Sequence, residues 1–483
     1  DLYPEGMHEA LQVHNDVLRS VLIEVGGYEV RTEGDAFVLA FQTTQEAVSW
    51  CVKAQHALLE ADWPSQILKS IEAGEVLDSN MMPSFRGLRV RMGIHCGEPE
   101  IREIPVTGRT DYVGSMVHRA EGISDAVEEE NPKPKLIKKR KKGIIYSVSS
   151  WQNYFYCHTN ENAEDFKIER CPNLDEQNWE TYIAAKDEVL IGGLIFLKNW
   201  IIRGEKSNAL GKLFVRNKET NFEEELIFSD EKVIVPGVSL IQRDKNTDFV
   251  YLSYSSPKTP GKTYLYNLKT KEKKLVKEQE IPSGHNPDDY IVERLECPSH
   301  DGRLVPITIT RHKKTKIDGS ANILLYGYGS YGSSMSPGFS STRLSLIDRD
   351  IIWVTAHIRG GMERGMKWWK EGKLLNKKNT FKDYIATAKF LIDKNYTSKG
   401  KIIGMGGSAG GLLMGAVVNE APELFLGMIM AVPFVDSLTT NLDHSLPLTV
   451  GEFDEFGNAK DNKEHFDYIF SYAPYNNIKK MDY

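Results

Sequence analysis

The spacing of hydrophobic residues changes three times along the chain, and each spacing predicts a different architecture. In the first part, apolar residues from Met7 to Val25 recur on one stripe with the period of a helix. The run from Tyr28 to Phe41 predicts a hairpin, and Thr43 with Glu46 has the spacing of a capping box that opens a second helix, ending near Ala61. With a buried strand expected from Leu88 to His95, this order of elements favours an α+β sandwich.

From about Ile144 to Cys297 the pattern indicates strands alone. Thr263 to Val276 has the pattern of two strands joined across a charged turn, which is typical of the outer half of a propeller blade. At roughly 40–50 residues for each blade, the segment has room for three or four blades of a partial β-propeller. The clearest apolar-alternating runs are Ile144–Val148, Phe155–Cys157, Leu190–Leu197, Trp200–Arg203, Lys212–Val215 and Phe249–Tyr254.

The spacing changes again at Asn322. Four short, continuous apolar runs are typical of parallel strands covered on both faces. Amphipathic helices are expected from Thr380 to Lys394 and from Ala409 to about Asn419. We therefore predict a doubly wound, mostly parallel α/β-hydrolase sheet over residues 298–483, with ligands at the carboxyl ends of its strands. The four runs are Ile323–Tyr328, Ile351–His357, Ile402–Met405 and Met428–Val432.

Charge composition divides the chain near residue 131. Residues 1–131 carry 10 Lys and Arg against 23 Asp and Glu, whereas the remainder carries 50 against 44. Eight of the first 10 bases are Arg, but 38 of the later 50 are Lys. A solvated surface accepts either base, so the change suggests two segments of different ancestry. At 483 residues the chain is too long for one core, and we expect a multidomain protein with parts at 1–130, 131–143 (a linker), 144–297 and 298–483.

Composition also limits the classes of partner. No apolar run is long enough to cross a membrane. The five cysteines are scattered without metal-ligand spacing, which favours reduced thiols in a cytoplasmic protein. The basic cluster Lys138–Lys142 has no aromatic or glycine-rich pattern around it, so we interpret it as a solvated connector. We expect neither a membrane nor a nucleic acid as partner.

A glycine-rich serine motif has the clearest chemistry. Gly406-Gly-Ser408-Ala-Gly-Gly411 follows a predicted strand and precedes a predicted helix. A serine on so tight a turn adopts strained backbone angles, and it exposes its Oγ above the sheet at a helix N-terminus. No Gly-Lys-Ser/Thr is present, which argues against a phosphate loop. The motif therefore predicts Ser408 as the nucleophile of an α/β-hydrolase.

Five stretches occur in order along the second part of the chain: Leu325–Gly332, His357–Gly361, Gly372–Phe381, Gly406–Gly411 and Leu446–Gly457. These motifs resemble the prolyl oligopeptidase family, and oligopeptidase B within it, from about Lys133 to Tyr483. The resemblance implies a serine peptidase that cleaves short peptides after Arg or Lys and needs no cofactor. It assigns the Tyr328 hydroxyl and the backbone N–H of Ala409 to the oxyanion, and Glu452 and Asp454 to the basic side chain of the substrate. On the residues alone, an ordinary acidic loop that includes Glu455 is the alternative.

The resemblance also raises the question of the base. In these hydrolases an Asp and a His follow the Ser in the chain, and by the resemblance both lie beyond Tyr483. Asp436 and His444 are alternatives, but each follows its strand too early in the chain. Losing a triad costs on the order of 10⁶ in rate, so we expect residues 1–483 to be a peptidase by ancestry with impaired activity.

The acidic first part of the chain holds three motifs, Arg31–Phe37, Arg89–His95 and Thr107–Ala120. With them, residues 1 to about 127 resemble a class III adenylate cyclase catalytic domain of the fungal type. The resemblance implies conversion of ATP to cyclic AMP, Mg²⁺ bound by paired carboxylates, and a dimer with shared sites. It places Asp35 at one metal aspartate, Asp111 at the adenine-selecting aspartate, and Arg31 at the adenine-contacting lysine. The second metal aspartate would precede residue 1, and His118 and Gly122 replace an Asn and an Arg, so we expect impairment.

Two further hypotheses compete with this composite enzyme. The chain could be a catalytically dead interaction or scaffold protein assembled from the same pieces. It could also be an artificial or mis-assembled fusion, because the composition changes so sharply across Glu128–Lys142.

Overall fold

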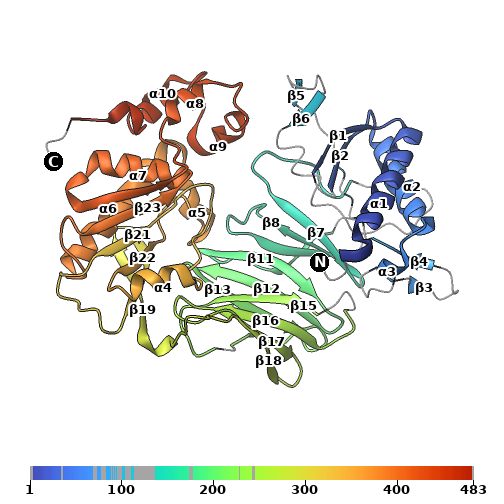
Figure 1. Ribbon diagram of the computed structural model, residues 1–483, viewed down its shortest axis with the longest axis horizontal. Coiled ribbons are helices and arrows are strands. Elements are labelled where there is room, and N and C mark those ends of the chain that lie inside the picture. The colour runs from blue at the N-terminus through green and yellow to red at the C-terminus, as the bar shows by residue number, and fades with distance from the viewer. Residues whose placement is uncertain are drawn as a thin grey trace. The chain divides into compact units, whose positions relative to one another are not determined.

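The computed structural model divides the chain into two compact units, Asp1–Lys135 and Leu136–Tyr483, each of which is described by itself (Figure 1). The division lies within the segment 131–143 that we expected to be a linker. The described residues are 4–33, 36–68, 73–74, 76–77, 83–88, 90, 92, 94, 100–103, 110–113, 136–172, 178–227, 229–241 and 245–480.

The first unit opens with the predicted helix, hairpin and helix. These are α1 (Pro4–Val25), the antiparallel strands β1 (Tyr28–Glu33) and β2 (Ala36–Ala40), and α2 (Thr44–Glu60). The capping box is present, because Thr43 Oγ1 accepts from Glu46 N at 3.2 Å and Glu46 Oε2 accepts from Thr43 N at 3.0 Å. The apolar stripes of α1 and α2 share one buried core, which includes Ala10, Leu18, Leu22, Trp50, Ala54 and Leu58.

Only alternate residues of the segment Leu88–His95, which was expected to form a buried strand, are described. Residues 88, 90, 92 and 94 are described, and none of them lies in a strand. The apolar side chains at 88, 90 and 92 still pack against the core, but the Val90 carbonyl accepts from Gln55 Nε2 at 2.8 Å. A side chain therefore takes up a carbonyl that a strand ladder would have used. The other elements of this unit are α3 (Ser65–Leu68), β3 (Val76–Leu77), β4 (Pro83–Phe85), β5 (Glu100–Glu103) and β6 (Thr110–Val113).

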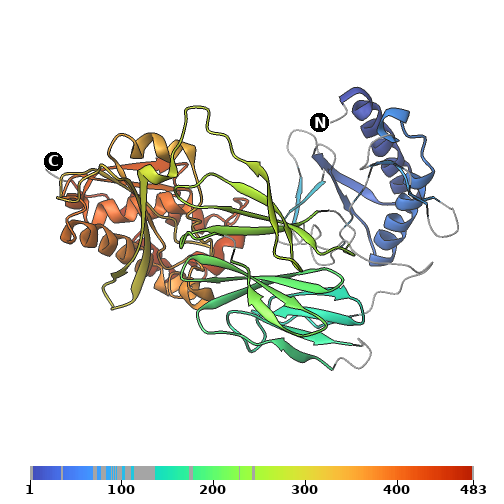
Figure 2. The ribbon, with the colours of Figure 1, turned by 90° about the horizontal axis from the view of Figure 1, so that it is seen from below.

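The second unit begins with three four-stranded antiparallel sheets, which confirms the partial propeller (Figure 2). No hydrogen-bonded ring joins the three sheets within the described residues. Their strands are β7 (Tyr146–Trp151), β8 (Tyr154–Thr159), β9 (Lys167–Cys171) and β10 (Glu180–Ile183); β11 (Val189–Phe196), β12 (Trp200–Ser207), β13 (Leu210–Asn217) and β14 (Glu223–Glu225); and β15 (Val235–Leu240), β16 (Phe249–Ser255), β17 (Lys262–Asn267) and β18 (Lys273–Glu278).

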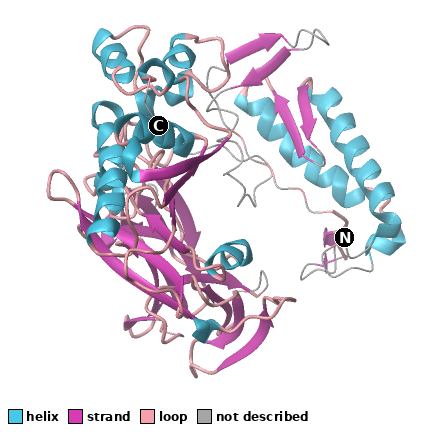
Figure 3. Cartoon of the chain, turned by 60° about the vertical axis from the view of Figure 1, so that its left-hand side comes forward, coloured by secondary structure: helices cyan, strands magenta, loops and turns pink. Residues whose placement is uncertain are grey.

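A six-stranded sheet follows, and it confirms the predicted α/β-hydrolase architecture (Figure 3). Its order is β19-β20-β22-β21-β23-β24, in which the last four strands are parallel to one another and β19 and β20 are antiparallel. Helices pack on both faces of the sheet, because Leu324 and Trp353 share a core with the single helix Ser341–Ile347, while the alternate positions share the main core with the helices Lys378–Asp393 and Ala409–Glu420. The strands are β19 (Tyr290–Pro298), β20 (Leu304–His312), β21 (Ile323–Tyr326), β22 (Ile352–Ala356), β23 (Ile402–Gly407) and β24 (Phe425–Ala431).

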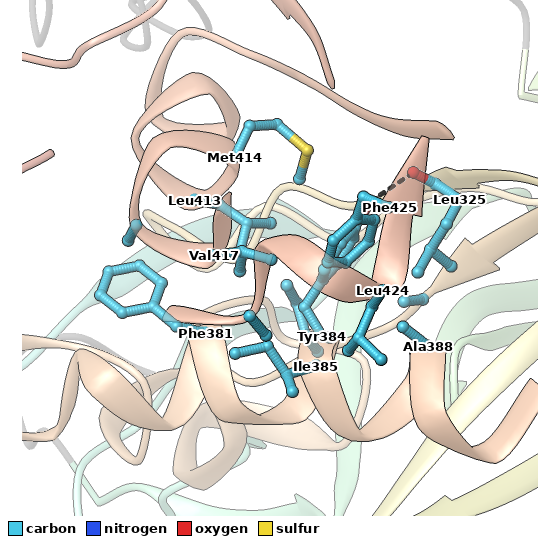
Figure 4. Packing of buried hydrophobic residues seen from close by; sticks show 14 of the residues in the cluster. Leu325, Phe381, Tyr384, Ile385, Ala388, Leu413, Met414, Val417, Leu424 and Phe425 are labelled. Atoms are coloured by element: carbon cyan, nitrogen blue, oxygen red, sulfur yellow. Dashed lines mark hydrogen bonds between the residues drawn. The ribbon is translucent and has the colours of Figure 1, made fainter. Parts of the chain in front are cut away.

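The helix α6 (Lys378–Asp393) provides a large part of the core on one face of this sheet. Its predicted apolar face is buried, with Phe381, Tyr384 and Leu391 no more than 1% exposed. The Tyr384 hydroxyl donates to the Leu325 carbonyl of β21 at 2.5 Å, so the helix is bonded to the centre of the sheet (Figure 4). This buried helix gives a fixed base for the residues at its N-terminus.

The outermost strand, β24, differs from the prediction. Met428–Val432 was expected to be covered on both faces, but Ile429 is 44% exposed and Val432 is 86% exposed. Within the described residues β24 pairs with β23 alone, and no helix covers its outer positions, so half of its apolar side chains face solvent.

None of the described helices is long and apolar enough to cross a membrane. The remaining helical elements of the second unit lie between its strands or, from residue 437 onward, follow the last strand. They are α4 (Ser341–Ile347), α5 (Gly365–Lys370), α7 (Ala409–Glu420), α8 (Ser437–Leu442), α9 (Phe453–Phe456), α10 (Lys463–Phe470), and the single turns η2 (Pro287–Asp289), η3 (Leu374–Asn376), η4 (Pro422–Leu424), η5 (Val450–Glu452) and η6 (Tyr475–Asn477).

Candidate active site

Ser408 occupies the turn between β23 and α7, as the sequence predicts. Its backbone angles are φ 54° and ψ −118°, a conformation that costs a non-glycine residue about 1–3 kcal/mol. The surrounding chain holds the turn, because Ser408 N donates to Ala431 O at 2.9 Å and Ser408 O accepts from Phe434 N at 3.0 Å. The side chain is exposed. The turn therefore presents the hydroxyl to solvent at the carboxyl end of a central strand.

The glycines beside Ser408 are required by close packing. A Cβ on Gly406 would lie 2.2 Å from the Gly410 carbonyl oxygen, and a Cβ on Gly411 would lie 2.4 Å from Pro433 Cβ. Both distances are far shorter than van der Waals contact, so no larger residue fits without moving the turn.

Two hydrogen-bond donors accompany the Ser408 hydroxyl. Tyr328 follows β21, and its hydroxyl interacts with that of Ser408. Burial raises the pKa of Tyr328, the Ser408 hydroxyl partly offsets this, and the nearby Glu455 and Glu452 carboxylates raise it further. The phenol is therefore protonated at neutral pH and can donate. Ala409 is the first residue of α7, so its N–H is one of the donors that a helix leaves without an intrahelical acceptor.

The acid segment, residues 450–457, approaches this site through Glu452. The Tyr331 hydroxyl donates to Glu452 Oε1 at 2.8 Å. Burial raises the pKa of Glu452, Tyr331 lowers it, and the neighbouring Glu455 raises it. Asp454, in contrast, is exposed on α9. Of the two carboxylates that the resemblance assigns to a basic side chain, the structure brings Glu452 to the loop that carries Tyr328 and leaves Asp454 at the surface.

A buried ion pair beneath this site was not predicted. Lys377 and Glu455 are 1% and 3% exposed, and Lys377 Nζ lies 3.5 Å from Glu455 Oε1. Burial lowers the pKa of Lys377 to about 8, although Glu455 acts in the opposite direction. Both residues lie within motifs quoted above, but charged residues in glycine-rich or acidic stretches normally face solvent. The pattern alone therefore carries no signal of their burial.

Within the described residues, no histidine or carboxylate is hydrogen-bonded to the Ser408 hydroxyl. Asp436 caps α8 and accepts from Thr439 N at 3.4 Å. The ring of His444 lies 5.1 Å from that of Phe453. Neither of these alternative triad partners is brought to the serine.

The structure does not describe the side chains of the residues assigned to nucleotide and metal binding. Asp35 lies outside the described residues, as do His118 and Gly122. Arg31 and Asp111 lie on β1 and β6, but their side chains are outside the description. Elsewhere in the described part of the chain, no group of three or more His, Cys, Asp or Glu residues could hold a metal ion.

Three family models match the chain. Residues 337–483 match the prolyl oligopeptidase family, and residues 114–279 match the N-terminal β-propeller domain of prolyl oligopeptidase. Residues 1–130 match the adenylate and guanylate cyclase catalytic domain.

Curated relatives and solved structures agree with the first two matches. Dipeptidyl aminopeptidase BI of Pseudoxanthomonas mexicana is 39% identical over 348 residues, which are 71% of this chain and 47% of the relative. Protease 2 of Moraxella lacunata is 39% identical over 360 residues, 72% of this chain and 50% of the relative.

Oligopeptidase B structures from Leishmania major and from Trypanosoma brucei, the latter with covalently bound antipain, align with TM-scores of 0.67 and 0.68 at 31% and 33% identity. They cover 73% and 72% of this chain and 50% of each structure. The chain thus spans about half the length of the relatives it matches.

Proposed function

Because residues 114–279 and 337–483 belong to the prolyl oligopeptidase family, we propose that the second unit is built for serine peptidase chemistry on short peptides, with Ser408 as the nucleophile. The observation that carries this proposal is the exposed serine in a strained strand-to-helix turn with the Tyr328 hydroxyl beside it. Such a turn stores strain that packing alone does not require, and its use is to expose a reactive oxygen.

The reaction follows from the positions of the donors. Ser408 Oγ attacks the carbonyl carbon of the scissile bond, and the carbonyl electron pair moves to its oxygen. The Tyr328 O–H and the Ala409 N–H stabilise this oxyanion, a contribution commonly worth about 3–4 kcal/mol for one donor. The intermediate then expels the amine, which departs with the proton that the Ser408 hydroxyl has lost, and water hydrolyses the acyl-serine to the acid and the free hydroxyl. No step uses a cofactor.

The serine proton needs an acceptor, and no described histidine or carboxylate contacts the Ser408 hydroxyl. We propose for this reason that residues 1–483 by themselves hydrolyse peptides slowly. In serine proteases, loss of the triad lowers kcat on the order of 10⁶-fold, while the oxyanion donors and substrate binding retain a small residual rate.

Substrates with Arg or Lys before the scissile bond are the preferred class in this proposal. Glu452 is half-buried and held by Tyr331, so it offers a carboxylate in a fixed orientation to a guanidinium or ammonium group. Asp454 adds a second negative charge from the exposed side. We expect Glu452 to contribute more than Asp454, because a partly desolvated carboxylate interacts more strongly with a cation.

Labelling of the chain with a fluorophosphonate probe, in parallel with the Ser408→Ala variant, tests the nucleophile. We expect slow labelling of the parent and none of Ser408→Ala. Equal signals from both would refute the assignment. Rapid hydrolysis of an Arg-containing fluorogenic dipeptide by the parent, absent in Ser408→Ala, would support the nucleophile and refute the impairment.

The match of residues 1–130 supports a second proposal for the first unit. We propose that it derives from an adenylate cyclase, with Arg31 and Asp111 toward ATP, Asp35 toward Mg²⁺, and a dimer as its working form. His118 and Gly122 stand where the resemblance places a transition-state Asn and a phosphate-binding Arg, so we expect no cyclic AMP from ATP even with excess Mn²⁺. Product that is detected in the parent and abolished by Asp35→Ala would refute this expectation.

The non-enzymatic alternatives have their own tests. A scaffold without chemistry would fail to label at Ser408, whereas a peptidase-derived site would label slowly. A contiguous transcript that covers the codons for Glu130–Lys142 would establish a natural fusion.

A further inference from the structure

The loop from Tyr328 to Gly332, here called the tyrosine loop, carries two polar side chains on either side of a buried centre. The Tyr328 hydroxyl interacts with Ser408, and the Tyr331 hydroxyl donates to Glu452. Between them, Gly329 and Ser330 are buried, and a Cβ on Gly329 would lie 2.3 Å from the Thr380 methyl group. The position of these two central residues therefore determines where both hydroxyls lie.

One buried ammonium holds that centre. Lys377 directly precedes α6, and its Nζ donates to Gly329 O at 2.7 Å and to Ser330 Oγ at 2.6 Å. Because α6 is bonded to the middle of the sheet and buried along one face, this ammonium is attached to a rigid part of the unit.

The same ammonium also faces the acid segment. Glu455 Oε1 lies 3.5 Å from Lys377 Nζ, and Glu455 Oε2 accepts from Trp369 Nε1 at 2.8 Å. The ring of Phe456 lies 5.4 Å from the same Nζ. The ammonium therefore donates two hydrogen bonds, to a carbonyl and to a hydroxyl, and the Glu455 carboxylate balances its charge at ion-pair distance.

We propose that Lys377 is a positioning residue, whose ammonium fixes the tyrosine loop against the acid segment and so sets the places of Tyr328 and Glu452 relative to Ser408. The contacts of Lys377 do not depend on any assigned function, whereas their consequence for catalysis rests on the proposed peptidase function. An apolar residue could fill the same volume, but it would leave Ser330 Oγ without the Lys377 donor and Gly329 O with only the longer bond from Thr380 Oγ1 at 3.4 Å, so the loop would be held less firmly.

The test compares four chains of residues 1–483: the parent, the double variant Lys377→Met/Glu455→Met, Tyr331→Phe, and Thr387→Val. The double variant is used because Lys377→Met alone would leave the Glu455 carboxylate buried without its cation. Thr387→Val is the matched control, since Thr387 is fully buried on α6 and its hydroxyl donates to Asp383 O, away from the tyrosine loop.

Hydrogen exchange of the peptide covering residues 328–335 is the first measurement. The Gly332 and Ser333 amides donate to Gly360 O and Ser330 O, so they report the order of the loop. We expect exchange at least about tenfold faster in the double variant, and parent-like exchange in Thr387→Val. Parent-like exchange in the double variant would overturn the proposal.

Two ligand measurements separate positioning from general destabilisation. Binding of agmatine, a guanidinium amine, reports Glu452, and fluorophosphonate labelling reports Tyr328 and Ser408. We expect the double variant to lose both by at least about tenfold, and Tyr331→Phe to lose agmatine binding alone. Loss of only one in the double variant would overturn the coupling. A parent chain that neither binds agmatine nor labels would refute the proposed function, and the exchange rates would still decide the role of Lys377.

Discussion

The Ser408 turn and the acid segment are specified in different ways. The turn depends largely on backbone geometry, because Gly406, packed against the Gly410 carbonyl, and Ser408 at φ 54° satisfy constraints that act over a few residues. The acid segment depends on buried side chains from distant parts of the chain, since Lys377 and Glu455 meet only after α6, the tyrosine loop and residues 450–457 have assembled. Local constraints leave a sequence motif, whereas long-range ones leave isolated charged residues whose partners the sequence does not show.

The largest expected effect comes from removing the long-range ion pair between Lys377 and Glu455. Lys377→Met should lower the free energy of unfolding by about 3–5 kcal/mol, because it leaves the Glu455 carboxylate buried without its cation. Lys377→Met/Glu455→Met should recover most of that loss, since the uncompensated charge is gone. Urea unfolding of the parent, both single variants and the double variant gives the coupling energy. Additive single effects would show that the pair does not interact.

A second buried group tests whether polar side chains inside this unit are neutral or charged. His357 is fully buried, and its Nε2 lies 2.9 Å from Thr308 Oγ1. Burial lowers the pKa of His357 to about 4. The Glu363 carboxylate raises this pKa, whereas the positive charge of Arg294 lowers it. Between about pH 6.5 and 4 the unfolded chain therefore binds a proton that the folded chain does not. The free energy of unfolding should therefore decrease as the pH is lowered from about 6.5 to 4, by at most about 3 kcal/mol for this residue.

Unfolding midpoints measured at pH 7 and pH 4.5, for the parent and for His357→Gln, isolate that effect. The variant should lose less stability than the parent over the same interval. An identical fall in the two proteins would assign the acid sensitivity to other groups.

The local side of the comparison is tested at Gly406. Gly406→Ala places a Cβ 2.2 Å from the Gly410 carbonyl, and an overpacked site of this kind costs about 1–3 kcal/mol. Because the strain falls on the turn itself, labelling of Ser408 should be lost even where the fold survives. Gly427→Ala on β24 is the control, since nothing lies within 4 Å of its Cβ. A normally labelled Gly406→Ala would show that the turn tolerates displacement.

The same division explains how much the sequence predicted. Periodicity was sufficient for α1, α2, α6 and the blades, because a regular stripe of apolar residues needs only a neighbouring surface. It was insufficient at Leu88–His95, where Gln55 occupies the Val90 carbonyl and no strand is described. Burial of Lys377 was not predicted either, because it requires two acceptors from the tyrosine loop and a carboxylate from the distant acid segment.

The smallest expected effect concerns β24, where an apolar run led to a wrong prediction of full burial. Leu426 and Val432 are 62% and 86% exposed, so Leu426→Ser and Val432→Ser remove little buried surface. Each should change the free energy of unfolding by no more than about 0.5 kcal/mol, as is usual for surface positions. Phe425→Ala, at a buried position of the same strand, should cost about 3–5 kcal/mol. A loss above about 2 kcal/mol in either serine variant would mean that this face is covered in solution, and β24 would then fit the two-sided burial that its sequence pattern suggested.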